Sequence, residues 1–264
     1  MIDFEKKSFY GVEDLREIVR ILRAPGGCPW DREQDHHSIR RNLLEEAYEA
    51  AEAIDEGNPE HLQEELGDVL LQVVFHARME EEQGGFDLDD VADGICKKLI
   101  YRHPHVFGDV TVSGSGEVLQ NWEELKKREK HQTTAADSVD SVARSLPGLW
   151  RAEKIQKKAA KVGFDWDSVD GAMDKLREET EELQTAIREG SNVSEELGDL
   201  LFAAVNVARF VKVDPETAMT AACDKFARRF RAVEEAARAQ GKDLASMTLA
   251  EMDALWDAVK QQEA

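Results

Sequence analysis

The sequence predicts an all-α protein that consists of two related halves. Three observations support this fold class. The chain of 264 residues contains only six prolines, which leaves room for long helices. Val, Ile, Thr and aromatic residues nowhere alternate with polar residues, so the two-residue period of a half-buried strand is missing. The third observation is an internal repeat, because one series of motifs occurs twice in the same order.

The repeat is clearest in two acidic motifs. Glu-Glu-Leu-Gly-Asp occurs at residues 64–68 and again at 195–199, and a Glu-x-x-Glu pair precedes each copy. Three further blocks recur around these motifs: Trp30-Asp31 and Trp166-Asp167, Cys96 to Arg102 and Cys223 to Arg229, and Trp122 to Lys126 and Trp256 to Lys260. Matched blocks in one order indicate a duplicated domain.

The boundary between the halves is expected where the helical pattern stops. Residues 131–146 begin with a polar run that lacks periodicity, and Pro147-Gly148 then indicates a turn. The sequence therefore predicts an N-terminal domain over residues 1–130, a linker over 131–146 and a C-terminal domain over 147–264.

Glycine and proline bound the helices that we expect in each half. In the first half the expected helices span residues 11–23, 38–56, 60–83 and 87–102. In the second half they span residues 149–161, 168–189, 193–211, 215–240 and 248–262. Asp214 is expected to cap the helix that Pro215 begins.

Composition limits the partners of this chain. A net charge of -21 repels phosphate, so we expect no nucleic-acid partner and no attraction to anionic membranes. The first residues lack an apolar signal region, and no apolar run approaches the roughly 18 residues that span a bilayer. The three cysteines are too sparse for a disulfide framework. We therefore expect a cytoplasmic protein.

The acidic residues of the second half are expected to meet. The helix that carries the second Glu-Glu-Leu-Gly-Asp motif is apolar on most sides, which predicts that it is largely buried. Glu196 and Asp199 nevertheless lie one turn apart within it, and Glu179 and Glu182 lie one turn apart on the preceding helix. Since Gly190 lets the chain reverse, we expect an antiparallel pair whose four carboxylates face one another.

Converging carboxylates repel one another and lose hydration, so protonation, a basic partner or a divalent cation must compensate. Ligands that are all oxygen suit magnesium or manganese rather than zinc. A di-iron bundle is the rival hypothesis, but it needs Glu-x-x-His on paired helices, and these motifs have no His at that step. A single Glu-x-x-Glu pair is usually a solvated surface feature, whereas here the pair recurs beside a motif that interrupts an apolar helix.

The acidic motifs, together with the segments Gly27 to Asp31, Arg102 to Phe107 and Gly163 to Trp166, resemble the tandem two-domain members of the MazG family. The resemblance covers nearly the whole chain. It implies two related helical-bundle domains of the MazG, all-α NTP pyrophosphatase type. It also implies a homodimer that hydrolyses nucleoside triphosphates between the α and β phosphates with Mg²⁺, or Mn²⁺, to give nucleoside monophosphate and pyrophosphate.

The resemblance implies roles for particular residues. In the second half the metal ligands and catalytic acids would be Glu179, Glu182, Glu196 and Asp199. Their counterparts in the first half, also as metal ligands, would be Glu46, Glu49, Glu65 and Asp68. The substrate-binding residues would be Lys225, Arg229, Trp256, Asn206 and Trp166. Glu178 or Glu195 could take the proton of the attacking water, and the sequence does not choose between them.

The second half is the expected catalytic unit, because in the first half Phe75 stands at the position that matches Asn206, and the matching helix ends in His103-Pro104-His105. For the first half, an active, a regulatory and a dimerisation role all stay open. The sequence does not decide whether such an activity would remove aberrant nucleotides or adjust a signalling pool. Two alternatives stay open. One is a non-catalytic acidic helical scaffold or metal-binding interaction protein. The other is a pyrophosphohydrolase for phosphoribosyl-ATP or another specialised nucleotide.

Overall fold

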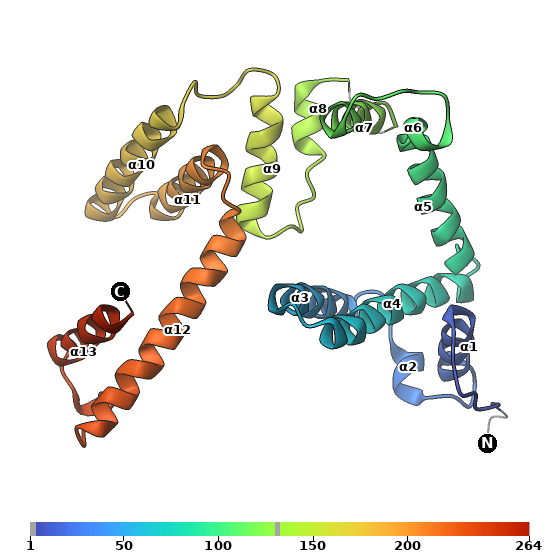
Figure 1. The fold of residues 1–264 in the computed structure, drawn as a ribbon, viewed down its shortest axis with the longest axis horizontal. Helices are drawn as coiled ribbons and strands as arrows, with labels where there is room; N and C mark the ends of the chain where they lie inside the picture. The colour runs from blue at the N-terminus through green and yellow to red at the C-terminus, as the bar shows by residue number, and fades with distance from the viewer. Residues whose placement is uncertain (1–3, 130–132, 264) are drawn as a thin grey trace. The chain divides into compact units, whose positions relative to one another are not determined.

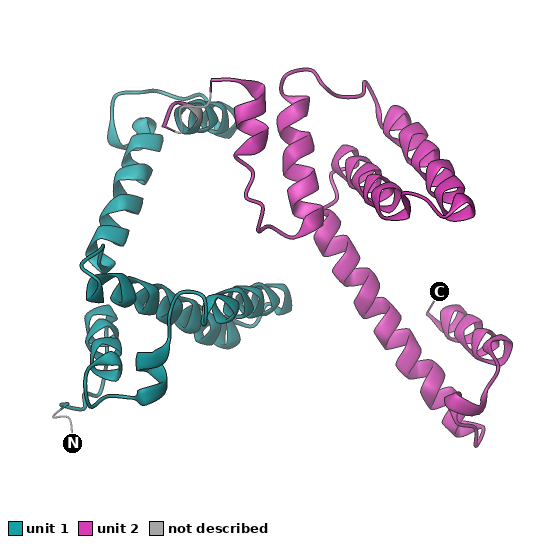
Figure 2. Ribbon diagram, turned by 180° about the vertical axis from the view of Figure 1, so that it is seen from behind, with its two compact units in different colours: residues 1–126 teal, residues 127–264 magenta. Residues whose placement is uncertain are grey.

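The computed structural model describes residues 4–129 and 133–263, so residues 131 and 132 of the expected linker lie outside the described residues. All regular secondary structure in these two ranges is helical, which confirms the predicted all-α class. The chain divides into two compact units, Met1–Lys126 and Lys127–Ala264, called unit 1 and unit 2 (Figures 1 and 2).

Every helix predicted from the sequence occurs, with ends that differ from the prediction by at most two residues. Unit 1 contains α1 (Val12–Arg23), α2 (Pro29–Glu33), α3 (Arg40–Glu56), α4 (Pro59–Glu82), α5 (Leu88–Arg102), α6 (Pro104–Phe107) and most of α7 (Ser115–Glu129). Unit 2 contains α8 (Ala135–Asp140), α9 (Gly148–Ala160), α10 (Val169–Glu189), α11 (Val193–Phe210), α12 (Pro215–Ala239), the short 3-10 helix η1 (Leu244–Ser246) and α13 (Leu249–Gln262).

The helices α2, α6, α7 and α8 were not expected. The helix α8 lies inside the expected linker, where Thr134 and Asp137 form a capping box that begins it. The turn expected at Pro147-Gly148 is wrong, because Pro147 is the N-cap of α9 and Gly148 its first residue. A fixed φ and a missing N–H suit proline to a helix start as well as to a turn. Asp214 caps α12 as predicted.

In each unit a helix hairpin carries the acidic motifs. The helices α3 and α4 pack along each other in unit 1, and α10 and α11 do so in unit 2 (Figure 1). Gly57 and Gly190 end the first helix of each pair with φ values of 65° and 69°. Glycine adopts this left-handed conformation without a steric penalty, so the chain can reverse within a short loop. The predicted antiparallel arrangement follows from these two turns.

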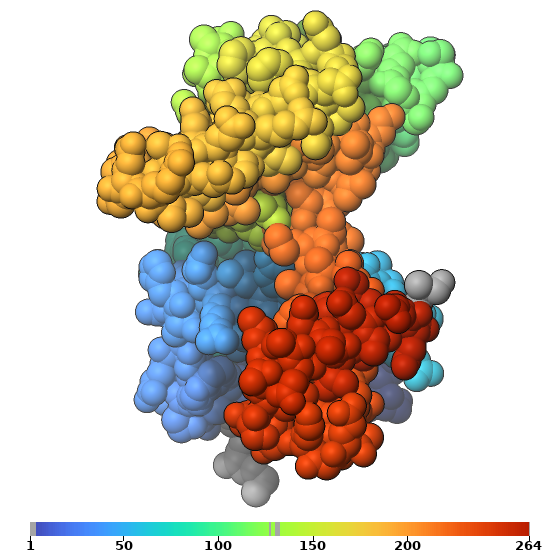
Figure 3. Space-filling view, turned by 90° about the vertical axis from the view of Figure 1, so that its left-hand side faces the viewer, coloured from blue at the N-terminus to red at the C-terminus, as the bar shows by residue number. Residues whose placement is uncertain are grey.

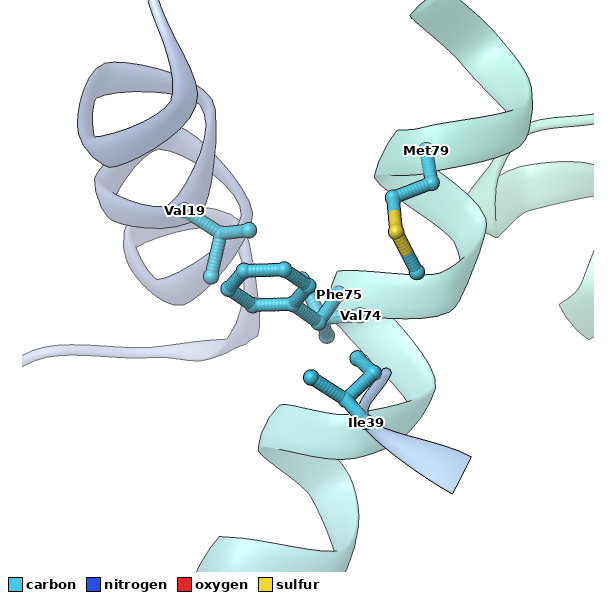
Figure 4. Packing of buried hydrophobic residues seen from close by; sticks show 5 residues of the cluster. All are labelled: Val19, Ile39, Val74, Phe75 and Met79. Atoms are coloured by element: carbon cyan, nitrogen blue, oxygen red, sulfur yellow. The ribbon is translucent and has the colours of Figure 1, made fainter. Parts of the chain in front are cut away.

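The unit 1 core joins α1 to α4. It consists of Val19, Ile39, Val74, Phe75 and Met79, all buried (Figure 4). The guanidinium of Arg23, on α1, lies over the Phe75 ring with its central carbon 5.2 Å from the ring centre. Phe75 is therefore covered by apolar groups and by a cation, and its ring belongs to the packed interior of unit 1.

The expectation that α11 is largely buried is wrong for the chain alone. Leu197 and Leu201 on α11, and the matching Leu66 and Leu70 on α4, are between 36% and 52% exposed. The helix packs against α9, α10 and α12, and these neighbours leave one apolar face of it uncovered within the described residues. The same apolar pair is exposed in both units of the described chain.

The helix α12 extends away from the α10–α11 pair and carries α13 at its far end. In Figure 3, α13 (red) lies apart from α10 and α11 (yellow to light orange), with α12 (orange) between them. Residues on α13 and on the distal part of α12 are therefore separated from the acidic hairpin of the same unit. None of the described helices is long and apolar enough to cross a membrane.

Candidate functional site

Three carboxylates of unit 2 converge between α10 and α11. Glu179 on α10, and Glu196 and Asp199 on α11, each place one oxygen within 4.8 Å of the others. Glu179 is only 6% exposed, whereas Asp199 reaches solvent. Because Glu196 and Asp199 are one turn apart and Glu179 faces them from the antiparallel neighbour, the hairpin itself holds this group, called the unit 2 acid group.

Glu182, the fourth predicted acid, lies beside this group and not within it. Desolvation, followed by repulsion from Glu179, raises the pKa of Glu182 above its usual value. Glu182, Glu196 and Glu178 line one open acidic groove of about 480 Å³. Glu195, by contrast, is an exposed residue in the first turn of α11. The groove therefore joins Glu182 and Glu178 to the acid group but does not include Glu195.

Unit 1 repeats this arrangement in its own hairpin. Glu46, Glu49 and Glu65 each place one oxygen within 4.8 Å of the others, and Glu65 is almost fully buried. Desolvation is the largest cause that raises the pKa of Glu46, followed by repulsion from Asp68, Glu49 and Glu65. The other three predicted acids of unit 1 therefore all act on Glu46.

Both acid groups suit a hard divalent cation. Their ligand atoms are all carboxylate oxygens, the donors that Mg²⁺, Mn²⁺ and Ca²⁺ prefer. Like charges at this spacing in a partly buried place are unfavourable unless a cation neutralises them, and the raised pKa values of Glu46 and Glu182 reflect that cost. Each unit therefore contains a group of acids that could bind a metal ion.

Lys175, which was not among the site residues predicted from the sequence, contacts the unit 2 acid group. The Lys175 ammonium lies 2.7 Å from a Glu179 oxygen and 2.8 Å from a Glu178 oxygen, and these bonds raise its pKa. The signal was available, because residues three and four apart on a helix are neighbours. The matching residue in unit 1 is Asn42, so the two acid groups differ in local charge.

A pocket of about 350 Å³ opens beside α11 in unit 2. Its aromatic wall consists of Phe164, Trp166 and Phe202, and its polar side chains are Gln156, Asp165, Asn206 and Arg209. Gly171 on α10 makes room for Trp166, since a Cβ at this glycine would lie 3.0 Å from the indole. Asn206 lies two turns beyond Asp199 on the same helix, ~10 Å along its axis. Such walls suit a flat ring with polar edges.

The corresponding space in unit 1 is filled. Phe75, which matches Asn206, lies in the unit 1 core (Figure 4). The Arg23 guanidinium lies over its ring. Leu71, which matches Phe202, packs against the same core. Unit 1 thus keeps the acids but has an apolar interior where unit 2 has a pocket.

Arg229 on α12 and Trp256 on α13 contact each other in unit 2, and Lys225 lies one turn before Arg229 on α12. The Arg229 guanidinium carbon lies 6.0 Å from the centre of the Trp256 ring, and in unit 1 the matching Arg102 lies 5.1 Å from Trp122. The paired geometry confirms that these blocks belong to the repeat. Within the described chain, none of the three residues lines the aromatic pocket or joins the unit 2 acid group.

Mg²⁺ is expected to raise the melting temperature of this protein by a few degrees at about pH 7.5 and to lose this effect towards about pH 4. Glu46 and Glu182 have raised pKa values in the folded state. The folded state therefore loses stability as the pH rises through these values and the acids ionise together. A cation offsets that repulsion at neutral pH, whereas at acid pH protonation removes both the repulsion and the ligands.

Differential scanning fluorimetry with MgCl₂, compared with NaCl at equal ionic strength, measures this effect. The double variant Glu46→Gln, Glu179→Gln is the control, because it removes one charge from each acid group and keeps the side-chain shape. An equal Mg²⁺ shift in this variant would show that the ion acts elsewhere.

Within the described residues, the fold and the site define an all-α protein with two acidic hairpins, each suited to a divalent cation, and a pocket in unit 2 that suits a flat ring. The model of the MazG nucleotide pyrophosphohydrolase domain matches residues 34–107 and 168–233, the segments that carry the two hairpins. The chain belongs to the MazG family, and it carries the domain twice.

Relatives match over nearly the whole chain. The nucleoside triphosphate pyrophosphohydrolase of Escherichia coli is 44% identical over 257 residues, which are 96% of this chain and 98% of the relative. The nucleoside triphosphate pyrophosphohydrolase/pyrophosphatase MazG of Thermotoga maritima is 43% identical over 248 residues, 94% of this chain and 95% of the relative. The uncharacterized protein YabN of Bacillus subtilis is 49% identical over 262 residues, 98% of this chain, but the chain spans only 53% of that relative.

Proposed function

We propose that this protein hydrolyses nucleoside triphosphates between the α and β phosphates and releases nucleoside monophosphate and pyrophosphate. It is then a hydrolase of phosphoric anhydrides. The observation that carries the proposal is that α11 contributes to both the unit 2 acid group and the aromatic pocket. Asp199 in the group and Asn206 in the pocket lie ~10 Å apart along the helix axis. This spacing suits a nucleotide whose base enters the pocket while its phosphates reach the acids. Family membership and the names of the Escherichia coli and Thermotoga maritima relatives support the reaction.

Unit 2 is the proposed catalytic unit. Trp166 and Asn206 line its pocket, whereas Phe75 and the unit 1 core fill the matching space in unit 1. A non-catalytic scaffold would need no such pocket beside its acids. Unit 1 keeps a group of acids but offers a nucleobase no matching place, so we propose that it binds a cation without hydrolysing nucleotides.

The proposed metal ligands of unit 2 are Glu179, Glu196 and Asp199, with Glu182 at their side, and the proposed ion is Mg²⁺, which Mn²⁺ could replace. Bound there, the ion would neutralise polyphosphate charge and polarise the reacting phosphorus. The chain supplies the buried Glu179 as a fixed anchor and Asp199 as the group nearest to solvent. Lys175 holds the Glu179 carboxylate in place from the preceding turn of α10.

Proton transfer is assigned to Glu178. Its side chain lines the acidic groove next to Glu182 and Glu196, and Glu195 does not line it. A carboxylate at the edge of the groove, outside the acid group, can accept the proton of an attacking water. Lys175 forms an ion pair with Glu178, and this pair keeps the Glu178 carboxylate directed along α10.

A homodimer is proposed to complete the site. Leu197 and Leu201 leave an apolar face of α11 exposed, and Phe226 on α12 is also exposed. Lys225 and Arg229 do not belong to the acid group of their own chain, so we propose that in a dimer they would hold the polyphosphate at the other subunit's acids. We place this protein in the cytoplasm, where nucleotides are abundant, with no nucleic-acid partner, because its charge repels phosphate chains.

Incubation of the protein with ATP and Mg²⁺ tests the proposed reaction. Anion-exchange chromatography should find AMP and pyrophosphate in equal amounts, and the other nucleoside and deoxynucleoside triphosphates should give the corresponding products. Release of ADP and orthophosphate would indicate cleavage at the other anhydride. Turnover restricted to phosphoribosyl-ATP would instead identify a specialised pyrophosphohydrolase.

A further inference from the structure

The aromatic pocket of unit 2 contains a side-chain amide whose direction is fixed by its neighbours. Arg209 donates from Nε and Nη2 to Oδ1 of Asn206, at 3.0 and 2.8 Å. A guanidinium has only donors, so the amide oxygen of Asn206 must face it and the NH₂ group must face away. Arg209 is itself held by a two-pronged ion pair with Asp165. Among the described residues Nδ2 of Asn206 has no hydrogen-bond partner, so it remains a donor on the pocket wall.

A second amide on the pocket wall has the opposite character. Gln156 donates from Nε2 to the carbonyl oxygen of Phe202 at 2.7 Å, and the two residues are 46 positions apart. A carbonyl oxygen only accepts, so the amide nitrogen of Gln156 must face it and Oε1 is left over. The residue is 7% exposed, and Oε1 is a buried acceptor without a partner in the described chain. Buried acceptors without a partner are rare in native proteins and require an explanation.

A ligand that satisfies both amides presents a donor beside an acceptor on the edge of a flat ring. The pairing edge of each standard nucleobase has this pattern. Adenine and cytosine place an amino group beside a ring nitrogen, and guanine and uracil place a ring N–H beside a carbonyl. Proteins read this edge by hydrogen bonds while aromatic side chains stack on the ring. Phe164 and Trp166 are exposed aromatic walls of this pocket, and their exposure gives them room to turn as a ring enters.

We propose that Gln156 and Asn206 together read the pairing edge of the nucleobase. Gln156 Oε1 accepts a hydrogen bond from the amino or ring N–H group, and Asn206 Nδ2 donates to the adjacent ring nitrogen or carbonyl. Arg209, held by Asp165, is a positioning residue that sets the direction of the Asn206 amide. The inference rests on the proposed nucleotide substrate of unit 2, and it names the part of that substrate which the pocket requires.

Triphosphates that lack one group of the edge test the inference. Purine riboside triphosphate is ATP without its amino group, and 1-deaza-ATP lacks the adjacent ring nitrogen. For the wild-type protein kcat/KM should be roughly ten-fold or more lower for each analogue than for ATP, mainly through KM, because each leaves one amide unpaired. Gln156→Leu should lower the value for ATP and remove the preference for the amino group, but keep the preference for the ring nitrogen. Asn206→Leu should do the reverse.

The matched control is Gln184→Leu, the same substitution at an exposed position of α10. It should keep both preferences. Equal kcat/KM values for ATP and both analogues with the wild-type protein would overturn the inference, even if a variant failed to fold. So would a Gln156→Leu protein that still prefers the amino group.

Calorimetry separates this inference from the proposed reaction. Binding of the α,β-methylene forms of ATP and of purine riboside triphosphate needs no hydrolysis. A binding preference for the ATP form in a protein that hydrolyses no triphosphate would refute the reaction and support the reading of the base. Equal binding of the two forms, or no binding of either, would overturn the reading of the base.

Discussion

Glu179→Gln is expected to lower the turnover of ATP by about a hundred-fold or more. The side chain is buried at the centre of the unit 2 acid group, and it is the member that α10 contributes. The amide keeps the shape of the side chain but removes one negative charge and weakens one oxygen ligand. Losing a fixed electrostatic group in a catalytic site typically costs two to three orders of magnitude in rate. Steady-state release of pyrophosphate from ATP with Mg²⁺ measures the effect.

The chain contains its own control for this substitution. Glu46→Gln is the same change at the matching position of unit 1, where Glu46 also faces two other carboxylates. It should leave most of the turnover, because Phe75 lies in the unit 1 core at the position that faces the pocket in unit 2. Circular dichroism should find the helix content of both variants unchanged. Equal losses in the two variants would refute the assignment of catalysis to unit 2, and full activity in Glu179→Gln would remove the acid group from the mechanism.

Spacing along the helices made the acid groups predictable, but only in part. Residues three apart share a helix face, so Glu196 with Asp199 and Glu179 with Glu182 could each be paired from the sequence. The angle at which α10 crosses α11 then decides which acids meet, and it brings Glu179 and not Glu182 into the group. Crossing angles depend on side-chain packing along both helices, which local spacing does not encode.

The pocket depends on contacts that local pattern cannot supply. Gln156 reaches the backbone of Phe202, and Arg209 reaches Asp165 across 44 positions in the chain. Such contacts appear only when α9, the loop before α10 and α11 have packed together. The hydrophobic pattern also led to a wrong expectation for α11. Apolar residues on most sides of a helix indicate burial, but they do not say whether the same chain or another molecule buries it. Leu197 and Leu201 remain exposed in the single chain.

Asn206→Phe is expected to lower kcat/KM for ATP by about a hundred-fold or more, through loss of binding, and to leave the acid group intact. The substitution gives α11 the residue that α4 has at Phe75. In unit 1 that ring lies in a packed core, and in unit 2 it would occupy a pocket of about 350 Å³ and remove the Nδ2 donor. KM for ATP and calorimetric binding of its α,β-methylene form measure the loss. The Mg²⁺ shift in melting temperature should persist.

The two readouts of Asn206→Phe separate the pocket from the acids. If ATP binding and the Mg²⁺ shift both disappeared, the substitution would have disturbed the hairpin, and the smaller Asn206→Leu change would then decide. If KM for ATP stayed unchanged, the base would bind elsewhere. The packing around Phe75 would then no longer support the proposal that unit 1 does not hydrolyse nucleotides. Loss of ATP binding alone would mean that one position on the repeated helix, asparagine in α11 and phenylalanine in α4, separates a nucleotide site from a structural copy of it.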